Sequence, residues 1–263
     1  MTARLAAPSR SRLGGVLDDL LDDLLDYLGG EPSPALEVGP GPEGRVTRLL
    51  AQRGIRLTCL EPDERWAAAL GARTRDHASI SVLNLRLEDW EPPAESAHRF
   101  GILYAGQSWH LVEPGVRLQR ARQILRPGGV LAVSWKRVAN TDDPLRRALV
   151  EEYRRHSLGR LAALTLDDPD RPGRDVAART EIRAAADFTD HTVLARRTPV
   201  AVSKADYLAR LDAIPAYRAV PTKPRASLAA GLSSVFDGFG SDLVLDFVDE
   251  FFLARHTGRP GGE

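Results

Sequence analysis

Two carboxylates and a glycine-rich turn carry the chemistry best suited to binding a nucleoside. Glu37 lies in the short apolar run 35–38, and residues 39–44 then have glycine at the first, third and sixth positions. Glycines let the backbone approach a ligand closely, and the amphipathic segment that follows would present unpaired amides at its start. Glu61 ends the next apolar run, where a carboxylate can accept both hydroxyls of a ribose. These residues predict a pocket for an adenosine-containing cofactor.

The glycine spacing alone leaves the cofactor open. Gly39, Gly41 and Gly44 satisfy G-x-G-x-x-G, which suits NAD and FAD as well as S-adenosylmethionine. Glu37 favours S-adenosylmethionine, because a carboxylate repels a pyrophosphate and attracts the ammonium of a methionine group. A nicotinamide or flavin oxidoreductase is the alternative, but the chain has no Tyr-x-x-x-Lys pair. A tight turn without a ligand is the purely structural interpretation.

The elements that must position these residues alternate between strand-like and helical patterns. This alternation predicts the α/β class, with a Rossmann-like, mostly parallel sheet and helices on both of its faces. Ligands bind at the carboxyl ends of the strands in such sheets. The apolar runs lie at 35–38, 55–60, 79–85, 100–105 and 129–135, and the helical patterns at 43–53, 63–75 and 114–126.

Three regions are predicted along the chain. Residues 1–34 form a tail and an amphipathic helix, residues 35–140 the cofactor-binding core, and residues 141–263 the remaining core elements. The last region includes a helical substrate cap at about 203–237 and a final strand. Its further elements are expected as a helix at 143–157, a loop at 167–173, a β-branched run at 190–202, helices at 203–211 and 224–236, and a strand at 243–253.

The composition limits the class of partner. Thirty-six basic residues balance 36 acidic ones, so no net charge attracts nucleic acid or an anionic membrane surface. A single cysteine, Cys59, excludes an internal disulfide and suits a reducing cytoplasm. The paired aspartates of residues 16–28 have no histidine among them and are expected as a solvated helix face, not a metal site. We expect a cytoplasmic protein, a monomer or homodimer, that acts on a small-molecule substrate without nucleic acid, membrane or metal.

Five sequence blocks occur in an order typical of one family. The blocks are residues 36–41, 60–63, 87–93, 105–114 and 125–129. They resemble the class I S-adenosylmethionine-dependent methyltransferases, and within these the small-molecule subgroup that includes trans-aconitate methyltransferase and bacterial relatives. The resemblance covers about residues 35–255, and the pair Trp109-His110 is its most specific part.

The resemblance implies a set of cofactor contacts. Asp89 is expected at the adenine amino group, and its neighbour Glu88 is the alternative, because adjacent side chains of an extended segment point to opposite sides. Trp90 either stacks near the adenine or belongs to the core. The full set is Glu37, Gly39, Gly41, Gly44, Glu61, Pro62, Glu88, Asp89, Trp90, Tyr104, Ala105, Gly106 and Gln107.

His110 is the candidate general base. A base is needed when the methyl acceptor is a hydroxyl, an amine or a carbon acid, whereas a carboxylate acceptor is already ionised. His110 would then be a hydrogen-bonding residue of the wall. Trp109 is expected to line the same wall, and Arg137 and Arg218 are candidates to face an anionic substrate.

Three positions depart from the family pattern. Glu43 is an extra residue in the glycine turn, which predicts a bulge beside the methionine end of the cofactor. Gly101 stands where the family has an aspartate, and Leu111 replaces a second tryptophan. These departures keep open a protein that binds S-adenosylmethionine on the same fold without transferring a methyl group.

Overall fold

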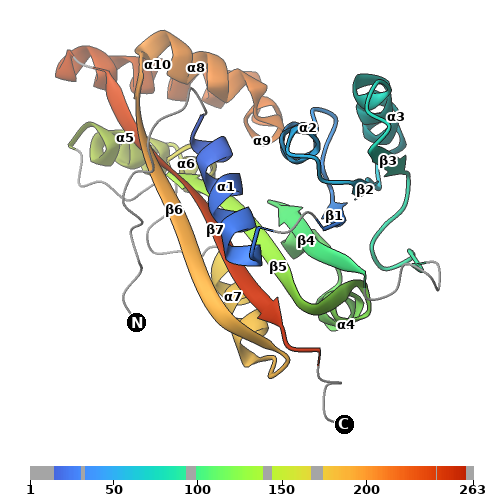
Figure 1. Ribbon diagram of the computed structural model, residues 1–263. Coiled ribbons are helices and arrows are strands. Elements are labelled where there is room, and N and C mark those ends of the chain that lie inside the picture. Colours follow the sequence, from blue (N-terminus) through green and yellow to red (C-terminus); the bar gives the residue numbers. More distant parts are fainter. Residues whose placement is uncertain are drawn as a thin grey trace. The chain divides into compact units, whose positions relative to one another are not determined.

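A computed structural model gives the fold. It describes residues 15–30, 33–92, 99–138, 144–166, 174–240 and 242–258. Seven strands form one sheet in the order β3-β2-β1-β4-β5-β7-β6 (Figure 1). Their bounds are Ala35–Val38 (β1), Leu57–Leu60 (β2), Ile80–Leu83 (β3), Phe100–Gly106 (β4), Leu125–Val138 (β5), Phe188–Val202 (β6) and Leu243–His256 (β7). The Rossmann-like α/β class predicted from the sequence is confirmed.

Helices connect most of these strands. The predicted ones are present, and α1 has the predicted bounds because Gly29 ends it in a left-handed conformation at φ 108°. None of the described helices is both long and apolar enough for a membrane crossing. The bounds are Val16–Leu28 (α1), Arg45–Gln52 (α2), Glu64–Thr74 (α3), Pro114–Ile124 (α4), Pro144–Arg155 (α5), Gly159–Thr165 (α6), Arg174–Ala184 (α7), Lys204–Ala213 (α8), Pro215–Arg218 (α9) and Thr222–Phe239 (α10), with a 3₁₀ turn at Trp109–Leu111 (η2).

The chain forms two compact units. The first takes its residues from 1–135, 172–196 and 249–263, and the second from 136–171 and 197–248. In the first unit, alternate strand residues face two separate cores, so that Leu36 belongs to one and its neighbour Ala35 to the other. The core around Ala35 also receives the leucine face of α1.

The second unit has its own core. Buried side chains of α5, α8 and α10 pack together in it, and the hydroxyls of Tyr153 and Tyr207 hydrogen bond at 3.0 Å. The helices at 203–237, expected from the sequence as a cap, are α8, α9 and α10 of this unit. Their function as a cap stays a prediction.

Strand β5 begins earlier than expected. The sequence predicts this strand from the apolar run at 129–135, whereas the strand already starts at Leu125. The pairing with β4 shifts its register between Phe100 and Ile102, so that residues 126–129 form an irregularity within β5. A Cβ on Gly129 would lie only 2.9 Å from the carbonyl oxygen of Arg126, so this close approach of the two backbone segments requires glycine at position 129. The loop predicted at 167–173 lies outside the described residues.

The strand register brings the predicted site residues to one edge of the sheet. Strand β1 pairs in parallel with both β2 and β4, with Glu37 opposite Cys59 on one side and Tyr104 on the other. The glycine turn after β1, Glu61 after β2 and the segment after Gly106 therefore leave the sheet at the same, carboxyl end. This is the end at which open α/β sheets bind ligands.

Candidate active site

The turn after β1 needs its glycines for different reasons. Gly39, Gly41 and Gly44 have φ angles of 64°, 70° and 48°, which favour glycine. A Cβ on Gly39 would lie 2.8 Å from the Cβ of Ser108, and one on Gly44 would lie 2.2 Å from Leu70. A Cβ on Gly41 would meet nothing within 4 Å. Gly41 thus borders open space, as expected where a ligand approaches the backbone.

Glu61 is fixed against this turn. It is 3% exposed, and its carboxylate accepts hydrogen bonds from the amides of Gly41 at 2.9 Å and Asp63 at 3.1 Å. Asp63 in turn caps the start of α3. Each carboxylate oxygen has more than one acceptor position, so both oxygens of Glu61 can accept a further hydroxyl. This arrangement fits the ribose contact that the sequence predicts for Glu61.

Glu37 lies under the glycine turn. It is 3% exposed, accepts a hydrogen bond from the hydroxyl of Thr47 on α2 at 2.7 Å, and has the sulfur of Cys59 at 3.9 Å. Burial raises the pKa of Glu37 to about 7, although the hydrogen bonds from Thr47 and Cys59 oppose the shift. Glu61 adds a smaller repulsion that raises the pKa further. A cationic ligand group would favour the ionised form of Glu37.

The segment after β4 packs directly on the glycine turn. The hydroxyl of Ser108 donates a hydrogen bond to the carbonyl of Val38, the last residue of β1. Gln107 is exposed and has a positive φ of 55°. Its backbone amide donates a hydrogen bond to the carbonyl of Ser134 at 2.8 Å. The chain therefore bends sharply between Gly106 and Ser108, and Ser108, the residue before the Trp-His pair, packs against Gly39 of the glycine turn.

Trp109 anchors the 3₁₀ turn that carries His110. The indole is fully buried, with the guanidinium carbon of Arg117 5.6 Å from the ring centroid. Arg117 also donates to the carbonyl of Trp109 at 2.9 Å and pairs with Glu181 of α7. His110 is partly buried, whereas Leu111 is 70% exposed. The catalytic and substrate-binding roles of His110 and Trp109 stay predictions.

Tyr104 is a buried member of the same strand end. Its hydroxyl lies 2.7 Å from that of Ser134, and burial raises its pKa. A Cβ on Gly106 would lie 2.7 Å from the Tyr104 hydroxyl, so glycine is required there. Ala105 between them is fully buried. We expect the backbone of these residues, more than their side chains, to border a cofactor.

The two acids after β3 have different environments. Glu88 accepts hydrogen bonds from the amide of Glu113 at 3.0 Å and from Arg86 at 3.1 Å. Partial burial opposes its ionisation, but these bonds outweigh the burial and lower its pKa. Asp89 is exposed. The ring of Trp90 packs edge-on against that of Phe100, with 6.0 Å between the ring centroids. Because the Glu88 carboxylate already accepts a hydrogen bond from Glu113, Asp89 is favoured as the adenine contact. This role of Asp89 stays a prediction.

Two departures from the family pattern have structural explanations. Glu43 is exposed and pairs at 3.1 Å with Arg73 of α3, so α3 holds its side chain. At Gly101 a Cβ would lie 2.3 Å from the Cβ of Ser33 and 3.6 Å from Leu28. The close approach of the segment after α1 therefore leaves no room for an aspartate at position 101.

The remaining predicted residues lie at the surface. Pro62 is exposed, and its carbonyl accepts a hydrogen bond from Asn84 at 2.9 Å. Arg137 and Arg218 are exposed and belong to the second unit. Within the described residues, no group of three or more histidine, cysteine or acidic side chains has the arrangement of a metal site.

Sequence reasoning missed the residues that hold the site together. Thr47 and Ser108 fix Glu37 and the glycine turn, and Arg117 fixes Trp109. Ser108 lies inside the block 105–114, Thr47 and Arg117 lie close to a predicted block, and all three are polar and buried. A threonine one helical turn into α2 and a serine just after β4 are the only signals, and neither is specific.

Comparisons with known proteins agree with this geometry. Residues 36–133 match the family described as "Methyltransferase domain". A proposed methyltransferase of Bacillus halodurans superposes with a TM-score of 0.54 at 15% identity, covering 89% of this chain and 98% of that chain. A proposed type II methyltransferase of Anaeromyxobacter dehalogenans gives 0.53 at 20% identity, with 90% and 96% covered. At these identities the superpositions show the fold.

One curated relative is similar in sequence. An rRNA adenine N-6-methyltransferase of Saccharopolyspora erythraea is 39% identical over 88 residues, which are 32% of this chain and 23% of that protein. The match thus spans less than a quarter of the relative. The trans-aconitate subgroup stays a prediction. The matched residues contain the glycine turn, Glu61 and the segment after β4, and they form a methyltransferase domain of the class that uses S-adenosylmethionine as its cofactor.

Proposed function

We propose that the protein transfers the methyl group of S-adenosylmethionine to a small-molecule acceptor. The observation that carries the proposal is Glu61, whose buried carboxylate is held by the amides of Gly41 and Asp63 beside open space at Gly41. Such a fixed acceptor pair suits the two hydroxyls of a ribose. The proposal also rests on the methyltransferase domain that spans this turn.

Each part of the site has a task in this proposal. The cofactor supplies a methyl group that its sulfonium makes reactive. Glu61 binds the ribose hydroxyls, and Asp89 accepts a hydrogen bond from the adenine amino group. Glu37 compensates the charge of the methionine ammonium. Because Glu37 is protonated more readily than an ordinary glutamate, binding of the ammonium would release a proton from it below about pH 7.

The chemistry asks little more of the protein than alignment and exclusion of water. The residues of the site would hold the acceptor in line with the methyl group of the bound cofactor and exclude water, so that the methyl group would pass to the acceptor and S-adenosylhomocysteine would be released. His110 would take the proton from a hydroxyl, amine or carbon acid as the new bond forms. A carboxylate acceptor needs no such proton transfer. Replacement of His110 should therefore slow methyl transfer to a hydroxyl, amine or carbon acid more than transfer to a carboxylate.

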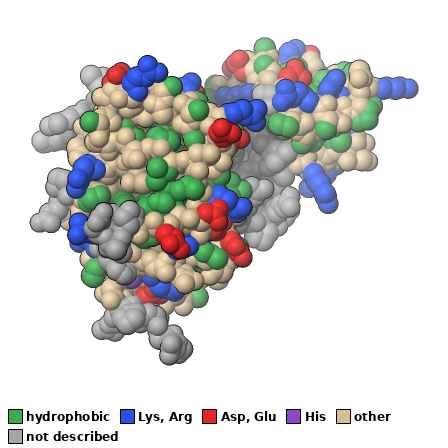
Figure 2. Space-filling model, turned by 90° about the vertical axis from the view of Figure 1, so that its right-hand side faces the viewer, with side chains coloured by type: hydrophobic (Ala, Val, Ile, Leu, Met, Phe, Trp, Pro, Cys, Tyr) green, Lys and Arg blue, Asp and Glu red, His purple; other side chains and the backbone are tan. Residues whose placement is uncertain are grey.

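Methylation of RNA is a second candidate function, favoured by the rRNA methyltransferase relative. Phosphate backbones are bound by clustered basic side chains. This chain has 36 basic and 36 acidic residues, and on the face shown in Figure 2 the two signs are interspersed. This balance favours the small-molecule acceptor.

A radiolabelled methyl-transfer assay tests the proposal. The full chain is incubated with S-adenosylmethionine and, in separate reactions, with panels of small carboxylic acids, phenols and amines and with bacterial rRNA. We expect label in a small-molecule fraction, with loss of transfer in Glu61→Ala and normal transfer in the exposed Glu43→Ala. Label in rRNA alone would establish the second candidate. Tight cofactor binding with no transfer to either class would favour a non-transferring protein.

A further inference from the structure

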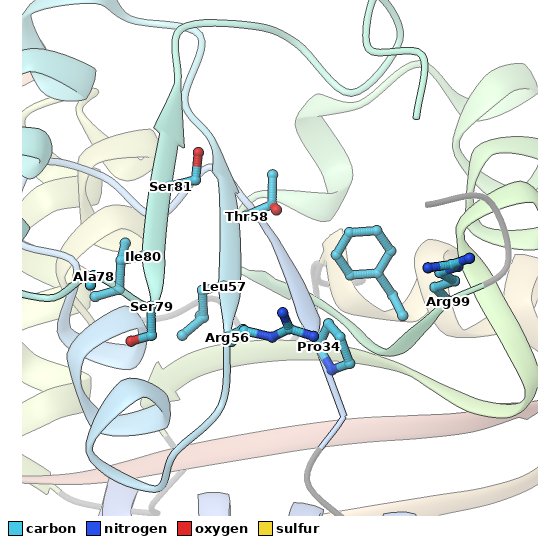
Figure 3. Close-up of a pocket in the computed structure, with 10 residues that line it drawn as sticks. Pro34, Arg56, Leu57, Thr58, Ala78, Ser79, Ile80, Ser81 and Arg99 are labelled. Atoms are coloured by element: carbon cyan, nitrogen blue, oxygen red, sulfur yellow. The ribbon is translucent and has the colours of Figure 1, made fainter. Parts of the chain in front are cut away.

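A cavity opens at the end of the sheet opposite to the cofactor residues. It has a volume of about 350 Å³ and lies at the amino ends of β1, β2, β3 and β4, whereas Glu61 lies at a carboxyl end. All of its lining residues belong to the first unit. They are Pro34, Arg56, Leu57, Thr58, Ala78, Ser79, Ile80, Ser81, Arg99 and Phe100 (Figure 3).

Two arginines give this cavity its charge. Arg56 directly precedes β2 and Arg99 directly precedes β4, and both residues are exposed. Figure 3 shows the side chain of Arg56 extending toward the side on which the Arg99 guanidinium lies. Within the described part of the chain neither side chain has an ion pair or a hydrogen bond, whereas nearby Arg53 pairs with Asp18 and Asp22. Two uncompensated guanidinium groups at one cavity attract an anion.

Hydroxyl groups and apolar side chains complete the lining. Thr58 of β2, Ser81 of the adjacent parallel strand β3 and Ser79 just before β3 supply three hydroxyls. Phe100 is 6% exposed and supplies an apolar wall. A lining of this mixed kind suits an anionic group attached to a small organic part. The volume lies at the lower end of the range of small-molecule sites, roughly 300 to 1,000 Å³.

We propose that this cavity binds a small phosphate ester. Arg56 and Arg99 hold the phosphate, because the planar guanidinium presents paired donors that match phosphate oxygens. The hydroxyls donate to the remaining oxygens, and the organic part lies against Phe100. The site is separate from the cofactor edge, so ligand binding here does not depend on the methyl-transfer proposal.

Isothermal titration of the full chain tests this site. The probes are inorganic phosphate and ribose 5-phosphate at low ionic strength, where charge attraction is least screened. We expect one saturable site per chain, with tighter binding of the ester than of inorganic phosphate. Arg56→Gln and Arg99→Gln should each weaken binding by about tenfold or more, because each removes a charge-assisted hydrogen-bonding partner. The exposed Arg210→Gln on α8 is the matched control and should bind like wild type.

The outcomes separate the alternatives. The absence of saturable binding, or an equal loss in Arg210→Gln, would overturn the proposal. Tighter binding of succinate or of a short single-stranded RNA than of ribose 5-phosphate would also overturn it, in favour of a dicarboxylate or a nucleic acid. Thermal unfolding of each variant checks that folding is unchanged. Glu61→Ala should keep phosphate-ester binding while losing cofactor binding, so the two proposals can fail independently.

Discussion

Replacement of Glu37 by glutamine tests the buried carboxyl group under the glycine turn. Glu37 is 3% exposed, and burial raises its pKa from 4.5 to about 7. Below pH 4.5 the carboxyl is protonated in both folded and unfolded chains. Between pH 4.5 and about 7 the unfolded chain alone loses the proton, so the free energy of unfolding falls as pH rises. Above about pH 7 this loss is constant.

The size of the effect follows from the two pKa values. The difference between 4.5 and about 7, at roughly 1.4 kcal/mol per pH unit, corresponds to about 3 kcal/mol. Most of this change falls between pH 5 and pH 8. Glutamine has nearly the same shape as glutamate, can still accept a hydrogen bond from the hydroxyl of Thr47, and does not ionise. We therefore expect the stability of Glu37→Gln relative to wild type to increase by roughly 2 to 3 kcal/mol from pH 5 to pH 8.

Urea unfolding at pH 5 and pH 8 measures this difference. Glu43→Gln is the control, because it makes the same substitution in the same turn at an exposed residue. Its stability relative to wild type should change little between the two pH values. If Glu37→Gln also shows the same relative stability at both pH values, the burial and raised pKa assigned to Glu37 are wrong.

Three further predictions concern the glycines and the histidine. Gly39→Ala should destabilise the fold by at least about 1 kcal/mol more than Gly41→Ala in urea unfolding, because only position 39 is packed against a neighbour; equal losses would contradict the packing. Gly101→Asp, which restores the family residue, should cost at least about 2 kcal/mol through its clash with Ser33, and a stable variant would refute that explanation. His110→Asn should bind S-adenosylmethionine normally but lower the rate of methyl transfer by about a hundredfold for a hydroxyl or amine acceptor; an unchanged rate would remove His110 from catalysis.

The sheet could be predicted because its strands have strong local signals. The runs around Leu36, Cys59 and Leu103 are short, apolar and separated by amphipathic segments, which is the pattern of a parallel sheet with covered faces. The carboxyl-end position of Glu37 and Glu61 follows from that pattern. Tertiary contacts then determine which neighbours each carboxylate has, so Thr47 and Ser108 could not be predicted.

Helix α7 shows where local signals are insufficient. Its sequence, Arg174–Ala184, is polar, and its helix is held by contacts far away in the chain. Arg179 pairs with Glu250 of β7, and Glu181 pairs with Arg117 of α4. The early start of β5 has a similar origin, since pairing with β4 outweighs the turn preference of Pro127 and Gly128. Long-range pairing, absent from any local pattern, determines both features.

Calorimetric titration with S-adenosylhomocysteine tests the central claim most directly. We expect one binding site in the wild-type chain, and affinity at least tenfold lower in Glu61→Ala, since hydrogen bonds to a charged group contribute roughly 1.5–3 kcal/mol. NAD should not bind detectably. Unchanged affinity in Glu61→Ala, or tighter binding of NAD than of S-adenosylhomocysteine, would contradict the nucleoside site built on Glu61 and the glycine turn.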